Sequence, residues 1–313
     1  MMQFPELLCL GEPMLELNQQ PDERYLAGHG GDTSNVAVAA ARQGASVGYL
    51  TRIGRDGFGE SFMELWESEG IDTRGVETCA DGHTGIYFVT HGPDGHRFSY
   101  HRAGSAASLM TPDFLPRGMI RAARILHLSG ISLAISDNAA DTVFAAITLA
   151  KEAGVKVSVD PNLRLKLWPL DRARAMTHAA MAEADIALPG LDDATLLTGK
   201  RDPDAIADFY LGLGAETVAL TLGKEGSLVA TATDRMRLPG HATDAKDATG
   251  AGDTFDGSFL AEYLRTGDPF AAGRHANMAA ALSTRGFGAV GPMPRRPEVD
   301  AALARHSEQV SSN

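Results

Sequence analysis

The heptapeptide Asp247–Asp253 reads Asp-Ala-Thr-Gly-Ala-Gly-Asp, and an apolar run with helical spacing follows it directly. Gly250 and Gly252 let the backbone turn sharply because neither carries a Cβ. Successive N–H groups and the N-terminus of the helix predicted over 252–265 can then point at one place, which suits a phosphate or another anion. Because Asp253 lies at the same place, the stretch indicates a carboxylate that accepts a proton while the N–H groups stabilise the charge that moves.

The heptapeptide alone leaves a simpler interpretation open. An aspartate at the start of a helix is often only an N-cap, and Gly-x-Gly is often only a turn. A Walker-type phosphate loop is excluded, because no Gly-Lys-Ser/Thr follows the glycines. The rest of the chain has to decide between an anion site and a capped turn.

Length and composition bound the possible functions. The chain has 313 residues, 44% of them apolar, which suffices for one large α/β domain or two small ones. A net charge of −12 argues against nucleic acid or an anionic membrane as partner, and an anionic substrate would need local arginines or lysines. Cys9 and Cys79 form no C-x-x-C pair, so neither a disulfide framework nor a zinc site is indicated. With no signal-peptide pattern and no apolar run near about 20 residues, we expect a cytoplasmic protein.

Strands and helices alternate regularly from residue 124 onward. This pattern predicts a parallel sheet with right-handed crossovers and helices on both faces, and ligands of such sheets bind at the carboxyl ends of the strands. Two informative loops leave those ends, 160–164 and 222–226. The predicted strands are 125–128, 155–160, 186–189 and 218–222, and the predicted helices are 137–153, 171–183, 203–213 and 269–283.

The N-terminal half contains two more strands and a hairpin. Strands are predicted over 7–10 and 46–53, and helices over 36–42 and 60–69. Residues 84–91 and 97–102 alternate like two further strands, and Gly92-Pro-Asp-Gly95 between them is a hairpin turn. Because the faces of this hairpin are more polar than those of a core strand, we expect a flap outside the main sheet.

These motifs resemble a known family. Gly30-Gly31-x-x-x-Asn35, with Gly44 and Gly54, resembles the first signature of the ribokinase-like (phosphofructokinase B-type) sugar kinases, and the heptapeptide resembles the second. The resemblance covers nearly the whole chain. It implies a three-layer α/β/α, doubly wound and mostly parallel sheet, in a single domain over 1–313 with a small β lid from about 12–30 and 82–106. It also implies transfer of the ATP γ-phosphoryl group to a sugar hydroxyl.

The resemblance implies a role for each matching residue. Asp253 is the expected catalytic base, and the N–H groups of Gly250, Ala251 and Gly252 are the expected anion hole. The residues expected to bind the nucleotide are Thr221, Gly223, Gly226, Gly250, Gly252 and, near the adenine, Asn277.

Two cation sites are also implied. Asp247 and Thr249 match part of a monovalent-cation site, for K⁺, which the tail around 288–291 would complete. Many relatives carry Asn-x-x-Glu where this chain reads Gly190-Leu-Asp-Asp193, and that motif helps to position hydrated Mg²⁺. Asp193 can stand in for the glutamate, acting indirectly, but Gly190 has no side chain to replace the asparagine. The alternative is that Asp192 and Asp193 cap the following helix.

The sugar site resembles that of one branch, the 2-keto-3-deoxygluconate kinases. Guanidinium groups bind the carboxylate of such a sugar acid in a fork. The residues that match the sugar site are Gly31, Asn35, Tyr87, Tyr100, Arg102, Arg164 and Asp253.

Simpler interpretations of these residues remain open. Arg102 can be a solvated hairpin arginine, Arg164 a loop ion pair, and Tyr87 and Tyr100 packing residues of the lid. The alternative functions are a fructokinase or ribokinase for a neutral sugar, or a non-catalytic sugar- or nucleotide-binding regulator. We expect a homo-oligomer formed through the lid.

Overall fold

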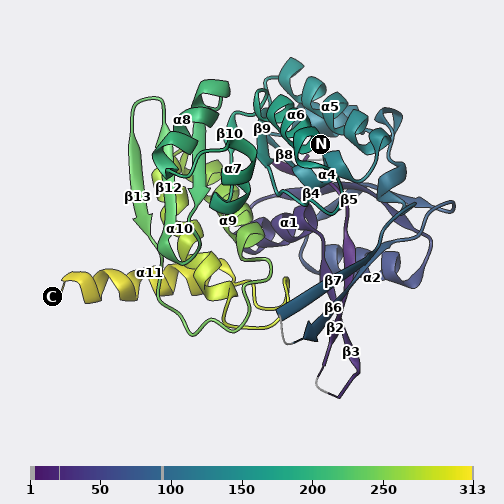
Figure 1. The fold of residues 1–313 in the computed structure, drawn as a ribbon, viewed down its shortest axis with the longest axis horizontal. Coiled ribbons are helices and arrows are strands. Elements are labelled where there is room, and N and C mark those ends of the chain that lie inside the picture. Colours follow the sequence, from purple (N-terminus) through teal and green to yellow (C-terminus); the bar gives the residue numbers. More distant parts are fainter. Residues whose placement is uncertain (1–3, 21, 93–94, 312–313) are drawn as a thin grey trace.

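The first strand of the chain has two apolar faces. In β1 (Leu7–Leu10), Leu7 and Cys9 pack into one hydrophobic core and Leu8 and Leu10 into another, and all four residues are fully buried. A strand covered on both faces belongs at the centre of a parallel sheet with helices on each side. The computed structural model, which describes residues 4–20, 22–92 and 95–311, has this arrangement (Figure 1).

In the described part of the chain, nine strands form the main sheet. Neighbouring strands are parallel except for the pairs β11–β12 and β12–β13, which are antiparallel. From one edge to the other the strands are β13 (Arg235–Pro239), β12 (Gly226–Thr231), β11 (Thr217–Thr221), β10 (Ile186–Ala187), β9 (Lys156–Asp160), β8 (Ile125–Ser129), β1, β4 (Val47–Gly54) and β5 (Asp72–Cys79).

Helices cover both faces of this sheet, each over its own core. One face carries α1 (Asp32–Arg42), α2 (Gly57–Ser68), α9 (Ala251–Thr266) and α10 (Pro269–Ser283), with α11 (Arg296–Ser311) packed on α10. The other face carries α3 (Arg117–Ala122), α4 (Gly130–Ala134), α5 (Asp137–Glu152), α6 (Leu170–Met181), α7 (Leu191–Thr198) and α8 (Pro203–Leu213). The predicted three-layer, doubly wound fold is confirmed. Within the described ranges, no helix is long and apolar enough to cross a membrane.

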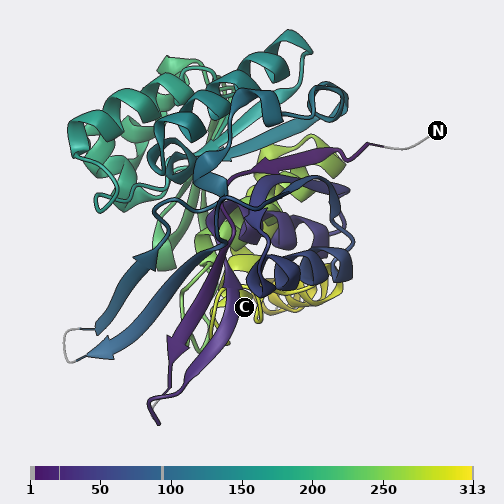
Figure 2. The same ribbon diagram turned by 90° about the vertical axis from the view of Figure 1, so that its right-hand side faces the viewer.

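A second, smaller sheet extends away from the three layers (Figure 2). Its strands, in order, are β3 (Tyr25–Gly30), β2 (Met14–Gln19), β6 (Gly85–Gly92) and β7 (Gly95–His101). β2 and β6 are parallel, whereas the other two pairs are antiparallel. Gly92 pairs with Gly95, as the predicted hairpin requires, and Pro93 and Asp94 of its turn lie outside the described residues.

Several elements were not predicted. β5, β12, β13 and α11 are absent from the sequence analysis, and α1 begins at Asp32 rather than at residue 36. β13 is an edge strand in which Arg235 and Arg237 alternate with Met236 and Leu238 and only Leu238 is buried, so its hydrophobic pattern is weak. The first turn of α1 was missed because it contains the polar residues Asp32, Thr33 and Ser34, which are buried but do not add to an apolar periodicity.

Candidate active site

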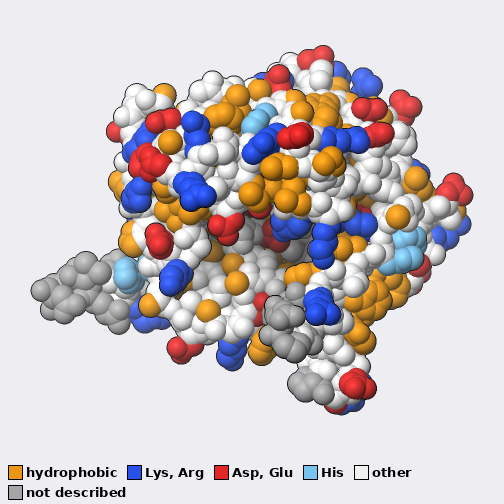
Figure 3. Space-filling model, viewed as in Figure 1, with side chains coloured by type: hydrophobic (Ala, Val, Ile, Leu, Met, Phe, Trp, Pro, Cys, Tyr) orange, Lys and Arg blue, Asp and Glu red, His pale blue; other side chains and the backbone are white. Residues whose placement is uncertain are grey.

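A cavity of about 660 Å³ opens at the carboxyl ends of the parallel strands, beside the small sheet. Figure 3 shows a hollow near the centre of this face. Its walls come from the loops after β1, β9 and β10, from the end of β11, from the N-termini of α1 and α9, and from β6 and β7. This is the edge at which ligands of open α/β sheets bind.

Asp253 lies in this cavity and does not cap its helix. α9 begins at Ala251, Gly250 occupies the N-cap position with φ 73°, and no side chain caps this end. Asp253 instead accepts a hydrogen bond of 2.7 Å from Nδ2 of Asn35 at Oδ2. Burial raises the pKa of Asp253 to about 7, although the Asn35 bond acts in the opposite direction. The capping alternative is therefore wrong, and the carboxyl group has a pKa near neutrality.

The glycine turn forms part of the cavity wall. Gly250 and Gly252 line the cavity wall. The N–H group of Ala251 donates to the carbonyl oxygen of Ala248 at 3.1 Å, within the turn itself. The two glycines of the predicted anion hole therefore lie at the cavity, and the Ala251 bond helps to shape the turn.

α1 and α9 pack at backbone distance, which fixes Asn35 against Asp253. A Cβ on Gly257 of α9 would lie only 2.4 Å from the carbonyl oxygen of Val36 in α1, so only glycine permits this approach. Because each helix carries its polar residues at its first turns, the close packing brings together two residues that are 218 positions apart.

Three aspartates in the cavity wall were not predicted from the sequence: Asp32, Asp160 and Asp256. Burial raises the pKa of each of them, and the negative charge of Asp253 adds to the effect at Asp160 and Asp256. Oδ2 of Asp32 is buried without a hydrogen-bond partner among the described atoms, and so is Oδ1 of Asn35. Unpaired buried acceptors in a cavity wall fit the hydroxyl groups of a bound ligand. The available signals were the spacing of three between Asp253 and Asp256 and the position of Asp160 at a strand end.

Arg102 is held in a buried ion pair. Its Nη2 contacts Oε2 of Glu12, and the exposed fractions of the two side chains are 11% and 0%. The other oxygen of Glu12, Oε1, accepts a hydrogen bond of 2.5 Å from Oγ of Ser105. Burial raises the pKa of Glu12, and Arg102 opposes that shift. The alternative of a solvated hairpin arginine is wrong, and Glu12 is a cavity residue that the sequence analysis did not identify.

Arg164 is freer than Arg102. Its side chain is 46% exposed and lies 3.9 Å from Oδ2 of Asp193. Its Nη1 donates to the carbonyl oxygen of Leu163 at 2.9 Å. Nearby Lys166, which also lines the cavity, donates to the carbonyl oxygen of Phe98 in β7 at 3.1 Å and so connects this loop to the small sheet.

The two tyrosines lie on neighbouring strands of the small sheet. The hydroxyl of Tyr87 donates to Oε2 of Glu16 at 2.5 Å. The ring of Tyr100 lies 6.2 Å from that of Tyr87, is 38% exposed, and has the guanidinium of Arg102 5.7 Å from its centroid. Both rings line the cavity as well as packing on each other.

Asp193 faces the cavity and does not cap α7. Its Oδ2 accepts a hydrogen bond of 2.8 Å from the N–H group of Leu163, whereas the N-cap of α7 is Gly190, without a side-chain cap. The capping alternative is therefore wrong for Asp193. Burial raises its pKa, and Arg164 lowers it. Across the described residues, no three His, Cys, Asp or Glu side chains are arranged to hold a metal ion. The carboxylates suit Mg²⁺ held through water and phosphate oxygens rather than in an all-protein cage.

Only part of the predicted nucleotide site lies in this cavity. Thr221 lines the cavity wall, and Asn277 instead donates to the carbonyl oxygens of Leu238 and Pro239 at 3.2 and 3.3 Å. Next to Asn277, Met278 lines a second cavity of about 430 Å³. Thr243 lines it too, and its Oγ1 is buried without a partner among the described atoms. Gly223 and Gly226 lie in the turn between β11 and β12, and both have positive φ.

Asp247 ties the heptapeptide to the tail of the chain. Its Oδ1 accepts from the N–H and Oγ1 of Thr249 at 2.9 and 2.6 Å, and its Oδ2 accepts from the N–H of Gly288 at 2.9 Å. This contact brings together the two segments that were expected to form the cation site.

Comparison with known proteins identifies the family of this chain. Residues 6–296 match the sequence model of the pfkB family of carbohydrate kinases. The chain is 34% identical to a 2-dehydro-3-deoxygluconokinase from Thermoproteus tenax, covering 93% of each chain. It is 32% identical to fructokinase-2 from Zea mays, covering 86% of this chain and 83% of the relative. A double mutant of the Vibrio cholerae O395 fructokinase, solved with fructose, ADP and a potassium ion, superposes with a TM-score of 0.86 at 27% identity, covering 96% of this chain and 99% of that one. The chain therefore belongs to the pfkB family of carbohydrate kinases.

Proposed function

We propose that this kinase phosphorylates a sugar acid, 2-keto-3-deoxygluconate, with ATP as the phosphoryl donor. The observation that carries the proposal is that Arg102 and Arg164 enter the same cavity as Asp253. In a protein with a net charge of −12, two guanidinium groups beside the reacting carboxyl group favour an anionic substrate. The relative from Thermoproteus tenax supports the same substrate. We further propose that the chain is a single domain in which the small sheet closes over the cavity as a lid.

The mechanism we propose uses Asp253 as a general base. Asn35 holds its Oδ2, and a pKa of about 7 suits a group that takes a proton near neutral pH. As a sugar hydroxyl loses its proton to Asp253, its oxygen forms a bond to the γ-phosphorus, and the bond from that phosphorus to the ADP oxygen breaks. The N–H groups around Gly250 and Gly252 stabilise the charge on the transferred phosphoryl group. Bound Mg²⁺ would neutralise phosphate charge, and Asp193 would orient its water ligands.

We place the adenosine part of ATP over the second cavity. Thr243 offers an unpaired hydroxyl there, and Asn277 fixes the backbone of the adjoining strand β13. The glycine turn at Gly223 and Gly226 leaves the approach to the phosphates open. With Thr221 in the first cavity, these residues outline a path from the adenine to Asp253.

A monovalent cation beside the anion hole is the second part of the proposal. Asp247, Thr249 and the backbone near Gly288 are in contact, and the related fructokinase was solved with potassium. A cation there would stabilise the glycine turn without touching the sugar. We expect higher activity in K⁺ than in tetramethylammonium at equal ionic strength, and equal rates in the two salts would remove this site.

Fructose is the strongest alternative substrate. The relative from Zea mays is a fructokinase at nearly the same identity, and Glu12 already neutralises Arg102. The distinguishing experiment is a coupled assay of ADP release with 2-keto-3-deoxygluconate, fructose and ribose. The proposal requires the highest kcat/KM for the acid. A preference for fructose or ribose would leave the kinase function intact but contradict the assignment of 2-keto-3-deoxygluconate as the substrate.

We also propose that two copies of the chain associate through the small sheet. On β3, Tyr25 and Leu26 are 44% and 60% exposed, which is unusual for large apolar side chains in one strand. Light scattering after size exclusion should show a dimer or larger assembly, and Leu26→Glu should shift it towards the monomer. A monomeric wild type would contradict this.

A further inference from the structure

The C-terminal end of α1 holds a loop that lies against the candidate active site. This loop, residues 285–294, joins α10 to α11 without a helix or strand, yet Ala289, Val290 and Met293 are buried. Buried backbone carbonyls need hydrogen-bond donors. Nη1 of Arg42 donates to the carbonyl oxygens of both Val290 and Met293 at 2.8 Å.

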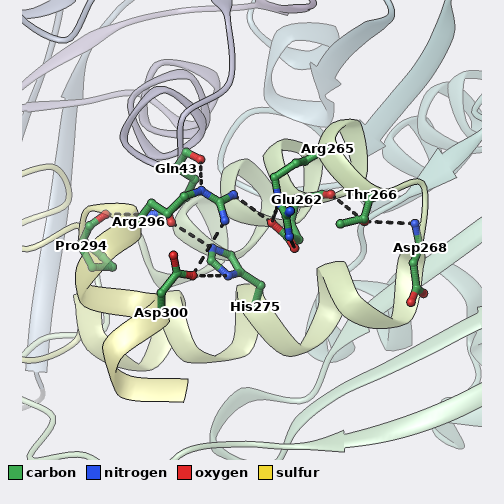
Figure 4. A network of polar contacts seen from close by, with 9 residues as sticks. All are labelled: Gln43, Glu262, Arg265, Thr266, Asp268, His275, Pro294, Arg296 and Asp300. Carbon is green, nitrogen blue, oxygen red and sulfur yellow. Dashed lines mark hydrogen bonds and ion pairs between the residues drawn. The ribbon is translucent and has the colours of Figure 1, made fainter. Parts of the chain in front are cut away.

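Arg42 is itself fixed by a buried carboxylate. Its Nε and Nη2 donate to Oε1 of Glu69 at 3.0 and 2.7 Å, and the exposed fractions of the two side chains are 12% and 6%. Burial alone would raise the pKa of Glu69, but Arg42 and Arg295 hold it below its ordinary value. The neighbouring Gln43 donates to the carbonyl oxygen of Pro294 at 2.7 Å, as Figure 4 shows. A planar guanidinium with several fixed bonds restrains the position of the loop, which a point charge would not do.

The other side of the loop touches the site. The N–H group of Gly288 donates to Asp247 at 2.9 Å. A Cβ on Gly250 would lie 3.0 Å from both Cα and Cβ of Ala289, so the glycine turn packs directly on the loop. A displacement of the loop would therefore move Asp247 and the turn that presents Gly250 to the cavity.

We propose that Arg42 is a positioning residue for phosphoryl transfer. It lies outside the cavity wall and acts through the loop, holding Asp247 and Gly250 where the transferred phosphoryl group and the cation bind. This inference rests on the proposed kinase function. One helix then sets two features of the site, because Asn35 near the start of α1 orients Asp253 and Arg42 at its end fixes the loop.

The test compares Arg42→Gln with Arg295→Gln. Arg295 also pairs with Glu69, at 3.1 Å, but its side chain is 60% exposed, and its described contacts do not include the carbonyls of Val290 or Met293. We expect Arg42→Gln to lower kcat at least about tenfold and to raise the K⁺ concentration for half-activation by a similar factor, with the KM for the sugar within about twofold. Arg295→Gln should remain close to wild type.

Arg42→Lys provides a second variant. It keeps the positive charge beside Glu69 but cannot bridge both carbonyls, so an intermediate kcat is expected. If Arg42→Gln does not fold, the kcat of Arg42→Lys tests the inference. Near-normal kcat and K⁺ activation in both variants would overturn the inference. So would parallel losses in kcat, sugar KM and Tm, which indicate a general structural defect. If the wild type shows no K⁺ activation, the inference is tested by whether Arg42→Gln lowers kcat while the KM for the sugar stays within about twofold. A wild type that phosphorylates no sugar overturns the kinase function and the inference with it, whereas an active wild type with unaffected variants overturns the inference alone.

Discussion

Buried carboxylates occur in two regions of this molecule, and their pKa values are shifted in opposite directions. In the cavity, burial raises the pKa of Asp160, Asp253 and Asp256, and each of these acids has other acids nearby. Around the end of α1 and the start of α11, arginines hold the pKa of Glu69 and Glu262 below the ordinary value despite burial.

The region around the end of α1 and the start of α11 is a network of paired charges (Figure 4). Glu262 accepts bonds from Nε of Arg265 at 3.0 Å and Nη2 of Arg296 at 2.9 Å. Arg296 also donates to the carbonyl oxygen of Gln43 at 2.6 Å, so the network joins α1, α9 and α11. The comparison separates two uses of a buried acid. Acids matched by arginines stabilise the packing of helices, whereas the cavity acids are left poorly compensated, which fits groups that receive protons and ligands.

Asp253→Asn should have the largest effect on kcat. The amide keeps the size of the side chain and can still accept the Asn35 bond, but it cannot take a proton. We expect kcat to fall by about 10²–10⁴ without loss of fold. The control is Asp268→Asn, because Asp268 caps α10 away from the cavity and asparagine caps equally well. Near-normal turnover in Asp253→Asn would remove the base from the mechanism.

Arg102→Ala tests whether the arginine that pairs with Glu12 also binds the substrate. We expect kcat/KM for 2-keto-3-deoxygluconate to fall at least about a hundredfold, or roughly 2.7 kcal/mol, because a charge of the substrate loses its partner in a partly dry site. Turnover of fructose, if present, should change much less.

Because Arg102→Ala also leaves Glu12 buried without a counter-charge, the double variant with Glu12→Gln is needed. If Arg102 binds the substrate carboxylate, the double variant keeps a low kcat/KM for 2-keto-3-deoxygluconate. If both substrates lose activity in the single variant and recover in the double, Arg102 only neutralises Glu12. Arg124→Ala is the control, because Arg124 forms an exposed ion pair with Glu6.

Glu262→Gln should affect stability and spare catalysis. The side chain of Glu262 is 6% exposed, and losing its charge weakens its ion pairs with Arg265 and Arg296. We expect the free energy of unfolding to fall by about 1.5–3 kcal/mol, measured by denaturant titration, with kcat little changed. Glu6→Gln, in an exposed pair, should cost only about 0–1 kcal/mol. A large loss of kcat in folded Glu262→Gln would erase the distinction between the two regions.

The pH dependence of stability should carry opposite signs in the two regions. Between pH 3.8, the ordinary pKa of an aspartate, and about pH 7, the folded Asp253 holds a proton that the unfolded chain has lost, so this contribution to stability declines as pH rises. Glu262 has a lowered pKa, so its contribution is present above 4.5 and declines as pH falls through the folded value. Asp253→Asn should therefore raise Tm relative to wild type more at pH 8 than at pH 5. An equal difference in Tm at both pH values would contradict the raised pKa.

The sequence by itself was sufficient for the fold class and for the glycine turn. Alternation of strands and helices follows from local periodicity, and a Gly-x-Gly turn before a helix is a property of a few adjacent residues. The parallel strands from β8 to β11 and the helices α5, α6, α8, α9 and α10 lie close to where they were expected. The polar start of α1 and the edge strand β13 carry little apolar periodicity, and that is why they were missed.

Only the tertiary structure decided which side chains meet. The Asn35–Asp253 bond spans 218 positions, the Arg102–Glu12 pair 90, and the Arg42 bond to Val290 248. Such pairs depend on strand order and on the backbone contact between α1 and α9, neither of which leaves a local pattern. The pKa of a carboxyl group likewise depends on how much water and how many charges surround it after folding. The sequence could therefore name Asp253 as a candidate base, but not distinguish the uncompensated acids of the cavity from the paired glutamates around the end of α1 and the start of α11.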